Sequence, residues 1–230
     1  MGCTLAVERS VAPGSWALYR DGACLAAHGF DASTPRAPAW VAELRRALAG
    51  LDVAPDALTS LVVGTGPGSF SGIRAAIAAL QGLALPRAVP LYGVPSAEAL
   101  AHGYLQRTGE TCAAVIGDAR RNRLWCAAYR RAPDGRLLLA ATGDTPAHTG
   151  ADVALVTWES LTAAVPADAR VLTPDGVRLA AGLARVRPGN GLPAESLTPS
   201  AADLGALFLT LGDTAPRDPV PVYLHPAVDG

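Results

Sequence analysis

Hydrophobic positions change their spacing along this chain, and the change divides it into predicted elements. Near the N-terminus, short apolar runs alternate with tight turns such as Asp21-Gly22, which predicts an antiparallel meander. Its strands are expected at 3–7, 15–19 and 23–28. From residue 58 onward apolar strands alternate with helical stripes, which indicates an α/β fold with parallel pairing and helices covering the sheet.

Two of the predicted helices, 38–49 and 72–85, have distinctive apolar faces. The first carries one apolar stripe, whereas the second is apolar or small almost all round, with only Arg74 and Gln81 plainly polar. Such a helix is either fully buried or shared between its own core and a partner. We interpret the second helix as part of a helix–helix interface, and the family resemblance described below implies the same for the first. The residues expected there are Trp40, Leu44, Arg74, Ile77, Ala78 and Gln81.

The second half of the chain opens like the first. Residues 5–22 and 113–135 share a buried strand, an acidic residue near the turn, an aromatic-bearing strand and then Asp-Gly. This predicts two related lobes, 1–108 and 109–230, each led by a β-hairpin; a chance likeness of two hairpins is the alternative. Packing of the terminal segment back onto the first lobe is left open.

The remaining elements follow from the same periodicity. Residues 188–200 contain Pro and Gly and are expected to form a loop. Strands are predicted at 60–63, 89–94, 111–117, 123–130, 136–141, 153–156 and 170–173, helices at 96–106, 158–164, 176–184 and 200–211, and an extended segment at 220–226.

Composition excludes several classes of protein. The net charge is −1 and all 19 basic residues are arginine, so a large phosphate-neutralising surface is not expected. The four cysteines have no C-x-x-C spacing and are interpreted as small buried hydrophobes. No apolar run reaches the roughly 18 residues that a membrane span requires. We therefore expect a cytoplasmic protein without a membrane association.

The stretch from Gly64 to Gly72 is rich in glycine and leads into the 72–85 helix. It lacks the lysine of a P-loop, and its spacing does not match a dinucleotide-binding loop. Two interpretations remain. The amides of Gly66 and Gly68 with the Ser69 hydroxyl could hold an anion at the helix N-terminus, or the glycines could simply permit a tight turn and close packing.

Chemistry-bearing residues outside this loop are few. Glu8 and Asp118 are the best-placed carboxylates, each at a strand end, and Arg120 follows the second of them. Acidic residues at such turns usually cap backbone groups. Glu8, Asp118 and Arg120 are kept as possible anion- or nucleotide-binding residues. The four histidines are scattered without a paired spacing, so no metal site and no catalytic residue is predicted.

The segment GTGPGSFSGIRAAIAALQGLAL resembles the bacterial TsaB (YeaZ) family, whose pattern there is G-x-GPGSFTG-[LIV]-R followed by a small-residue helix. The resemblance extends to TLAVERSVAPGSWALYRDG, to GDARRNRLWCAAYR and to PVYL at 221–224. The matching segments are spread from residue 4 to 224, so the resemblance covers essentially the whole chain. One departure is Glu8-Arg9, which stands where the family usually has Asp-Thr.

The resemblance implies an actin-like ASKHA fold of two lobes and a role in making N6-threonylcarbamoyladenosine in tRNA. It implies a non-catalytic dimerisation subunit that partners TsaD and works with TsaE. Whether the isolated chain is a homodimer is left open. Contact with tRNA is expected mainly through the complex. No cofactor is expected to bind tightly to the isolated chain, although ATP or ADP at the complex interface is left open. The alternative is an active ASKHA phosphotransferase or a metallopeptidase-like enzyme.

Overall fold

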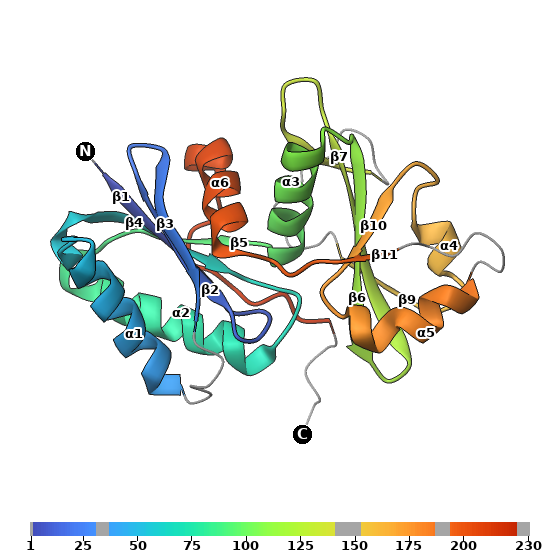
Figure 1. The fold of residues 1–230 in the computed structure, drawn as a ribbon, viewed down its shortest axis with the longest axis horizontal. Helices are drawn as coiled ribbons and strands as arrows, with labels where there is room; N and C mark the ends of the chain where they lie inside the picture. Colours follow the sequence, from blue (N-terminus) through green and yellow to red (C-terminus); the bar gives the residue numbers. More distant parts are fainter. Residues whose placement is uncertain (1, 31–36, 141–152, 187–193, 225–230) are drawn as a thin grey trace. The chain divides into compact units, whose positions relative to one another are not determined.

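The computed structural model describes residues 2–30, 37–140, 153–186 and 194–224. The chain forms two compact units, each with its own sheet (Figure 1). The first unit combines residues 1–99 with 199–221, and the second combines 100–198 with 222–230.

The first unit is built on a five-stranded mixed sheet in the order β3-β2-β1-β4-β5. Neighbouring strands β1, β2 and β3 pair antiparallel, as the meander pattern predicts, and β1–β4 and β4–β5 pair parallel. The strands are β1 (Cys3–Glu8), β2 (Ser15–Arg20), β3 (Ala23–Gly29), β4 (Leu58–Gly64) and β5 (Leu91–Val94).

Helices cover both faces of this first sheet (Figure 1). Because side chains alternate along a strand, Leu5 and Val7 of β1 face α1 (Ala37–Gly50) and α2 (Phe70–Ala84), whereas Ala6 faces the other layer. That other layer is α6 (Ala201–Leu211), which packs on β1, β2 and β4. A central strand with two buried faces has a continuous apolar sequence, and residues 3–7 of β1 show this pattern.

The second unit has a six-stranded sheet in the order β11-β10-β6-β7-β8, with β9 also paired to β7. The long β6–β7 hairpin forms its centre, and β6–β10 and β10–β11 are parallel. Side chains from β6, β7 and β9 form one apolar cluster with α4 and α5. The elements are β6 (Cys112–Arg120), β7 (Arg123–Arg131), β8 (Leu137–Leu139), β9 (Ala154–Val156), α4 (Leu161–Ala164), β10 (Arg170–Thr173), α5 (Gly176–Val186) and β11 (Ala194–Ser196).

Most predicted elements are present, with ends shifted by a few residues. The helix α3 (Ser96–Thr108) begins in the first unit and ends in the second. The prediction that 188–200 is only a loop is wrong in part, because β11 runs parallel to β10 within it. Three residues at a sheet edge carry too little periodicity to reveal a strand.

Residues 187–193 and 225–230 lie outside the described part of the chain. Within the described ranges, no helix has both the length and the apolar character to cross a bilayer.

Candidate functional site

The glycine-rich loop between β4 and α2 packs against the loop that follows β1, within the first unit. The Ser69 N–H donates to the Ser10 carbonyl oxygen at 2.7 Å. The Gly66 N–H donates to the Ser96 hydroxyl at 3.0 Å, and the Ser69 hydroxyl caps α2 by accepting from the Gly72 N–H at 3.2 Å. Two backbone donors of this loop, the Gly66 and Ser69 N–H groups, therefore already have acceptors within the chain.

Two glycines at the start of α2 are required by this close approach. A Cβ on Gly68 would overlap the carbonyl oxygen of Ser10, and a Cβ on Gly72 would overlap the carbonyl oxygen of Arg9. Any side chain at either position would push the two loops apart. The contacts thus favour the interpretation of the glycines as a tight, closely packed turn; the binding of an anion by Gly66, Gly68 and Ser69 stays a prediction.

Glu8 lies at the end of β1, fully buried beside Gly64. Its Oε1 accepts the Ser10 N–H, while Oε2 has no full hydrogen bond from any described residue, although Ser96 lies close enough to influence the carboxyl group. Burial raises the pKa of Glu8, and the polar contacts with Ser10 and Ser96 only partly oppose it. The carboxyl is therefore held between two loops in surroundings that favour its neutral form.

Arg9 fixes the loop after β1 against α1. Its guanidinium carbon lies 5.5 Å from the Phe30 ring centre and 5.3 Å from that of Trp40, and Nη1 donates to the Pro13 carbonyl oxygen at 2.7 Å. Burial lowers the pKa of Arg9, and the charge of Glu43 acts in the opposite direction. The arginine beside Glu8 is thus packed on aromatic rings.

The buried carboxyl of Glu8 predicts a specific pH dependence. Because its folded-state pKa is raised above the ordinary 4.5, the native chain keeps a proton that the unfolded chain releases, so stability falls as pH rises above that value. Glu8→Gln keeps the shape and cannot ionise. We expect its melting temperature to exceed that of the parent chain by a margin that grows from about pH 4 to about pH 8.

Thermal unfolding across this pH series tests the expectation, with Glu195→Gln, at an exposed carboxyl of β11, as the control. The control is expected to follow the parent chain. Parallel curves for Glu8→Gln and the parent chain would show that Glu8 ionises in the folded state without cost.

The predicted interface residues separate into two groups on α1 and α2. Three of them, Trp40, Leu44 and Ile77, are 2%, 4% and 8% exposed and belong to the core between these helices and the sheet. We expected these side chains on the surface, and that prediction is wrong. The apolar stripe of each helix is used by the unit itself. The other three, Arg74, Ala78 and Gln81, are exposed along one side of α2.

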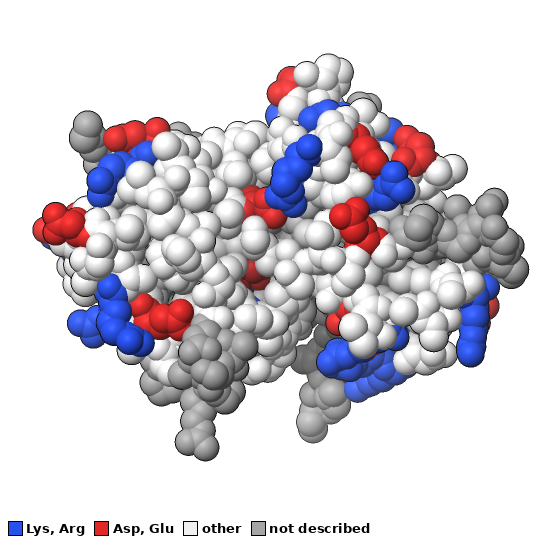
Figure 2. Space-filling view, viewed as in Figure 1, with Lys and Arg blue, Asp and Glu red and all other residues white. Residues whose placement is uncertain are grey.

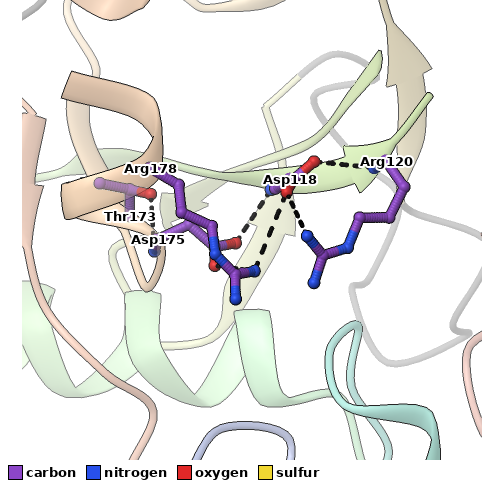
Figure 3. A network of polar contacts seen from close by, with 5 residues as sticks. All are labelled: Asp118, Arg120, Thr173, Asp175 and Arg178. Atoms are coloured by element: carbon purple, nitrogen blue, oxygen red, sulfur yellow. Dashed lines mark hydrogen bonds and ion pairs between the residues drawn. The ribbon is translucent and has the colours of Figure 1, made fainter. Parts of the chain in front are cut away.

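The second unit contains a separate polar network around Asp118, at the end of β6 (Figure 3). The Asp118 N–H donates to the Asp175 carboxylate at 2.9 Å, and the Asp118 carboxylate accepts from the backbone N–H and the guanidinium of Arg120 at 2.8 and 3.1 Å. Arg178 of α5 lies within 3.9 Å of Asp118 and 3.7 Å of Asp175. Thr173 supports Asp175 by accepting its N–H at 3.1 Å.

In the first unit, Ser10 and Ser96 contact both Glu8 and the loop that contains Gly66, Gly68 and Ser69. In the second unit, Asp118 pairs with Arg120. Asp175 and Arg178 were missed, although an acidic residue two positions after the predicted 170–173 strand is similar to the pattern that singled out Asp118. Among the described side chains, no group of three or more His, Cys, Asp or Glu could hold a metal ion.

Comparison with known sequences links this chain to tRNA-modifying proteins. Residues 39–148 match the family model of TsaD, described as tRNA N6-adenosine threonylcarbamoyltransferase. The Escherichia coli K12 tRNA threonylcarbamoyladenosine biosynthesis protein TsaB is 37% identical over 78 residues, which cover 34% of this chain and 34% of that protein. An uncharacterized Mycobacterium leprae protein is 37% identical over 84 residues, 36% of this chain and 22% of its own length. These matches span about a third or less of the relatives.

Solved structures extend the likeness to nearly the whole chain. A Pseudomonas aeruginosa protein described as similar to peptidase YEAZ has 27% identity and a TM-score of 0.77, covering 98% of this chain and 100% of that one. YeaZ from the same organism has 27% identity and a TM-score of 0.74, covering 97% and 100%. Both the sequence and the fold point the same way: the chain is similar to TsaB and YeaZ proteins and has the actin-like α/β fold.

Proposed function

We propose that this chain is a non-catalytic subunit that binds a TsaD-type partner for N6-threonylcarbamoyladenosine modification of tRNA. The likeness to TsaB and to the TsaD family model supports the pathway. The observation that carries the partner role is the exposed side of α2. The TsaE-type ATPase would join the same assembly, in the cytoplasm.

The exposed side of α2 is apolar at its ends and mixed in its middle, where Ala78 lies between Arg74 and Gln81. Phe70 is 55% exposed and Leu85, directly after the helix, is 79% exposed. Between them lie Arg74, whose guanidinium stacks at 4.2 Å on the Phe70 ring, and the short side chain of Ala78. The spacing places these residues on one face. Large apolar groups at both ends, with one alanine and two polar side chains between them, suit packing against a helix of another subunit.

The packing around Glu8 supports a non-catalytic role. The residues present do not offer a phosphate cradle in the isolated chain, because the Gly66 and Ser69 amides donate internally and Arg9 is packed on Phe30 and Trp40. We therefore place any bound ATP or ADP at the interface with the partner.

A charge on the α2 face tests the partner role. We expect Ala78→Glu to abolish co-purification with a tagged TsaD-type subunit and to reduce tRNA modification by the co-expressed TsaD- and TsaE-type proteins to the level without this chain. The carboxylate would lose its water in the interface without a partner charge. Ala181→Glu, at an exposed alanine of α5, is the matched control and should retain both properties.

The same experiment separates the alternatives. Undiminished partner binding by Ala78→Glu would remove the α2 interface from the proposal. If Ala78→Glu instead converts a homodimer to a monomer and leaves partner binding intact, the face joins two copies of this chain. Turnover of ATP with Mg²⁺, or of peptides, by the isolated chain would establish the enzymatic alternative.

A further inference from the structure

The turn of the β6–β7 hairpin carries an unusual concentration of positive charge for a chain whose net charge is −1. Arg120, Arg121 and Arg123 are all exposed there, and Arg178 at the start of α5 reaches the same place through its contact with Asp118. In Figure 2, basic side chains gather where the hairpin turn and the start of α5 lie in Figure 1.

Only part of this charge is neutralised locally. Asp118 pairs with Arg120 and, more distantly, with Arg178, which also approaches Asp175. By contrast, Arg121 and Arg123 form no ion pair with any residue in the described ranges. Four arginines face two carboxylates, so two guanidinium groups remain available to an external anion.

The backbone conformation of the turn is one that arginine rarely adopts. Arg120, Arg121 and Asn122 have φ of 66°, 52° and 57°, all in the left-handed region. Asn adopts this region readily, but arginine does so at a cost, and a two-residue hairpin turn of this type normally uses Asn and Gly. A position that breaks a local rule is expected at a functional site. The turn geometry alone does not explain why arginine stands at 120 and 121.

We propose that the β6–β7 turn binds the phosphate backbone of RNA. The inference rests on the proposed function, which makes tRNA the RNA available to this chain. Guanidinium groups match phosphate oxygens with two parallel hydrogen bonds, and contacts of this kind position an RNA without reading its bases. Arg121 and Arg123 make the contacts, and Asp118 holds Arg120 and Arg178 beside them.

The test removes the two unpaired charges and keeps the fold. Arg121→Gly/Arg123→Gln gives the left-handed position a residue that suits it, so the thermal stability is expected to be equal or higher. In the assembled TsaD-type complex, the slope of log K for an in vitro transcribed tRNA against log salt should decrease by about 1.8, with a loss of affinity on the order of tenfold. Arg45→Gln/Arg46→Gln on α1 removes equal charge and is the control.

The outcomes distinguish this inference from the proposed function. A complex of normal assembly whose salt slope and affinity for tRNA do not change in the hairpin variant overturns the RNA contact and leaves the partner role standing. If the parent chain does not assemble with the partner, the isolated full-length chain is titrated with the same tRNA at low salt. Weaker tRNA binding by the variant than by the parent chain then supports the inference, whereas equal tRNA binding by the two overturns it. Binding of the parent chain to phosphatidylserine vesicles without binding to tRNA also overturns it.

Discussion

Gly72→Ala is expected to lower the free energy of unfolding by about 3 kcal/mol. Its Cβ would overlap the Arg9 carbonyl oxygen and crowd the Ser69 hydroxyl that caps α2. Neither the backbone of the β1 loop nor the helix start can move without breaking the Ser69–Ser10 hydrogen bond. Urea denaturation measures the change as a lower midpoint at a similar slope.

The same substitution ten residues later should act in the opposite direction. No atom lies within 4 Å of a Cβ built on Gly82, near the exposed end of α2. Gly82→Ala is therefore expected to stabilise by about 0.5 kcal/mol, because alanine loses less backbone freedom on folding. If both variants changed the free energy of unfolding equally, helix propensity would explain both effects. The close packing of the two loops around Gly72 would then not be rigid.

Leu204→Ala is expected to cost about 3 kcal/mol, because the side chain is fully buried between α6 and the first sheet. The cavity would form at the layer that also contains Phe208 and Tyr92, whose rings lie 4.8 Å apart. Leu209→Ala in the same helix, at a side chain 39% exposed, should cost less than about 1 kcal/mol.

Chemical denaturation compares the two leucine variants through the fluorescence of Trp16, in a background whose other tryptophans, Trp40, Trp125 and Trp158, are replaced by phenylalanine. Trp16 belongs to the core of that unit, so its signal reports on the unit that α6 covers. A small and equal loss for both variants would contradict the assignment of α6 as a structural layer of the first sheet.

The sequence was sufficient to predict the order and type of most elements because their periodicity is strong. The β1–β3 meander has turn residues at its tips, and α1 has one clear apolar stripe. Prediction failed where one pattern had two meanings. Trp40, Leu44 and Ile77 were assigned to a partner, but an apolar stripe cannot by itself distinguish the unit's own core from an interface.

The site was less predictable than the fold because its contacts join distant segments. Ser96 meets the Gly66 amide across 30 residues, and Asp175 meets the Asp118 amide across 57. Spacing rules describe residues that are neighbours in one helix or strand, so they miss such pairs. The chemical type of Glu8 and Asp118 was visible in the sequence, whereas the burial of Glu8 depended on the packing of Gly64 and Ser96 against it.

The placement of α6 has a consequence for synthesis of the chain on the ribosome. The residues of β1, β2 and β4 that α6 covers are translated long before Ala201–Leu211, and the whole of α3 and the second sheet lies between them in the sequence. At about 5–20 residues per second, that face of the first sheet waits on the order of ten seconds for its cover. The nascent first unit therefore presents an apolar sheet face for that interval, and chaperones that recognise such surfaces have time to bind it.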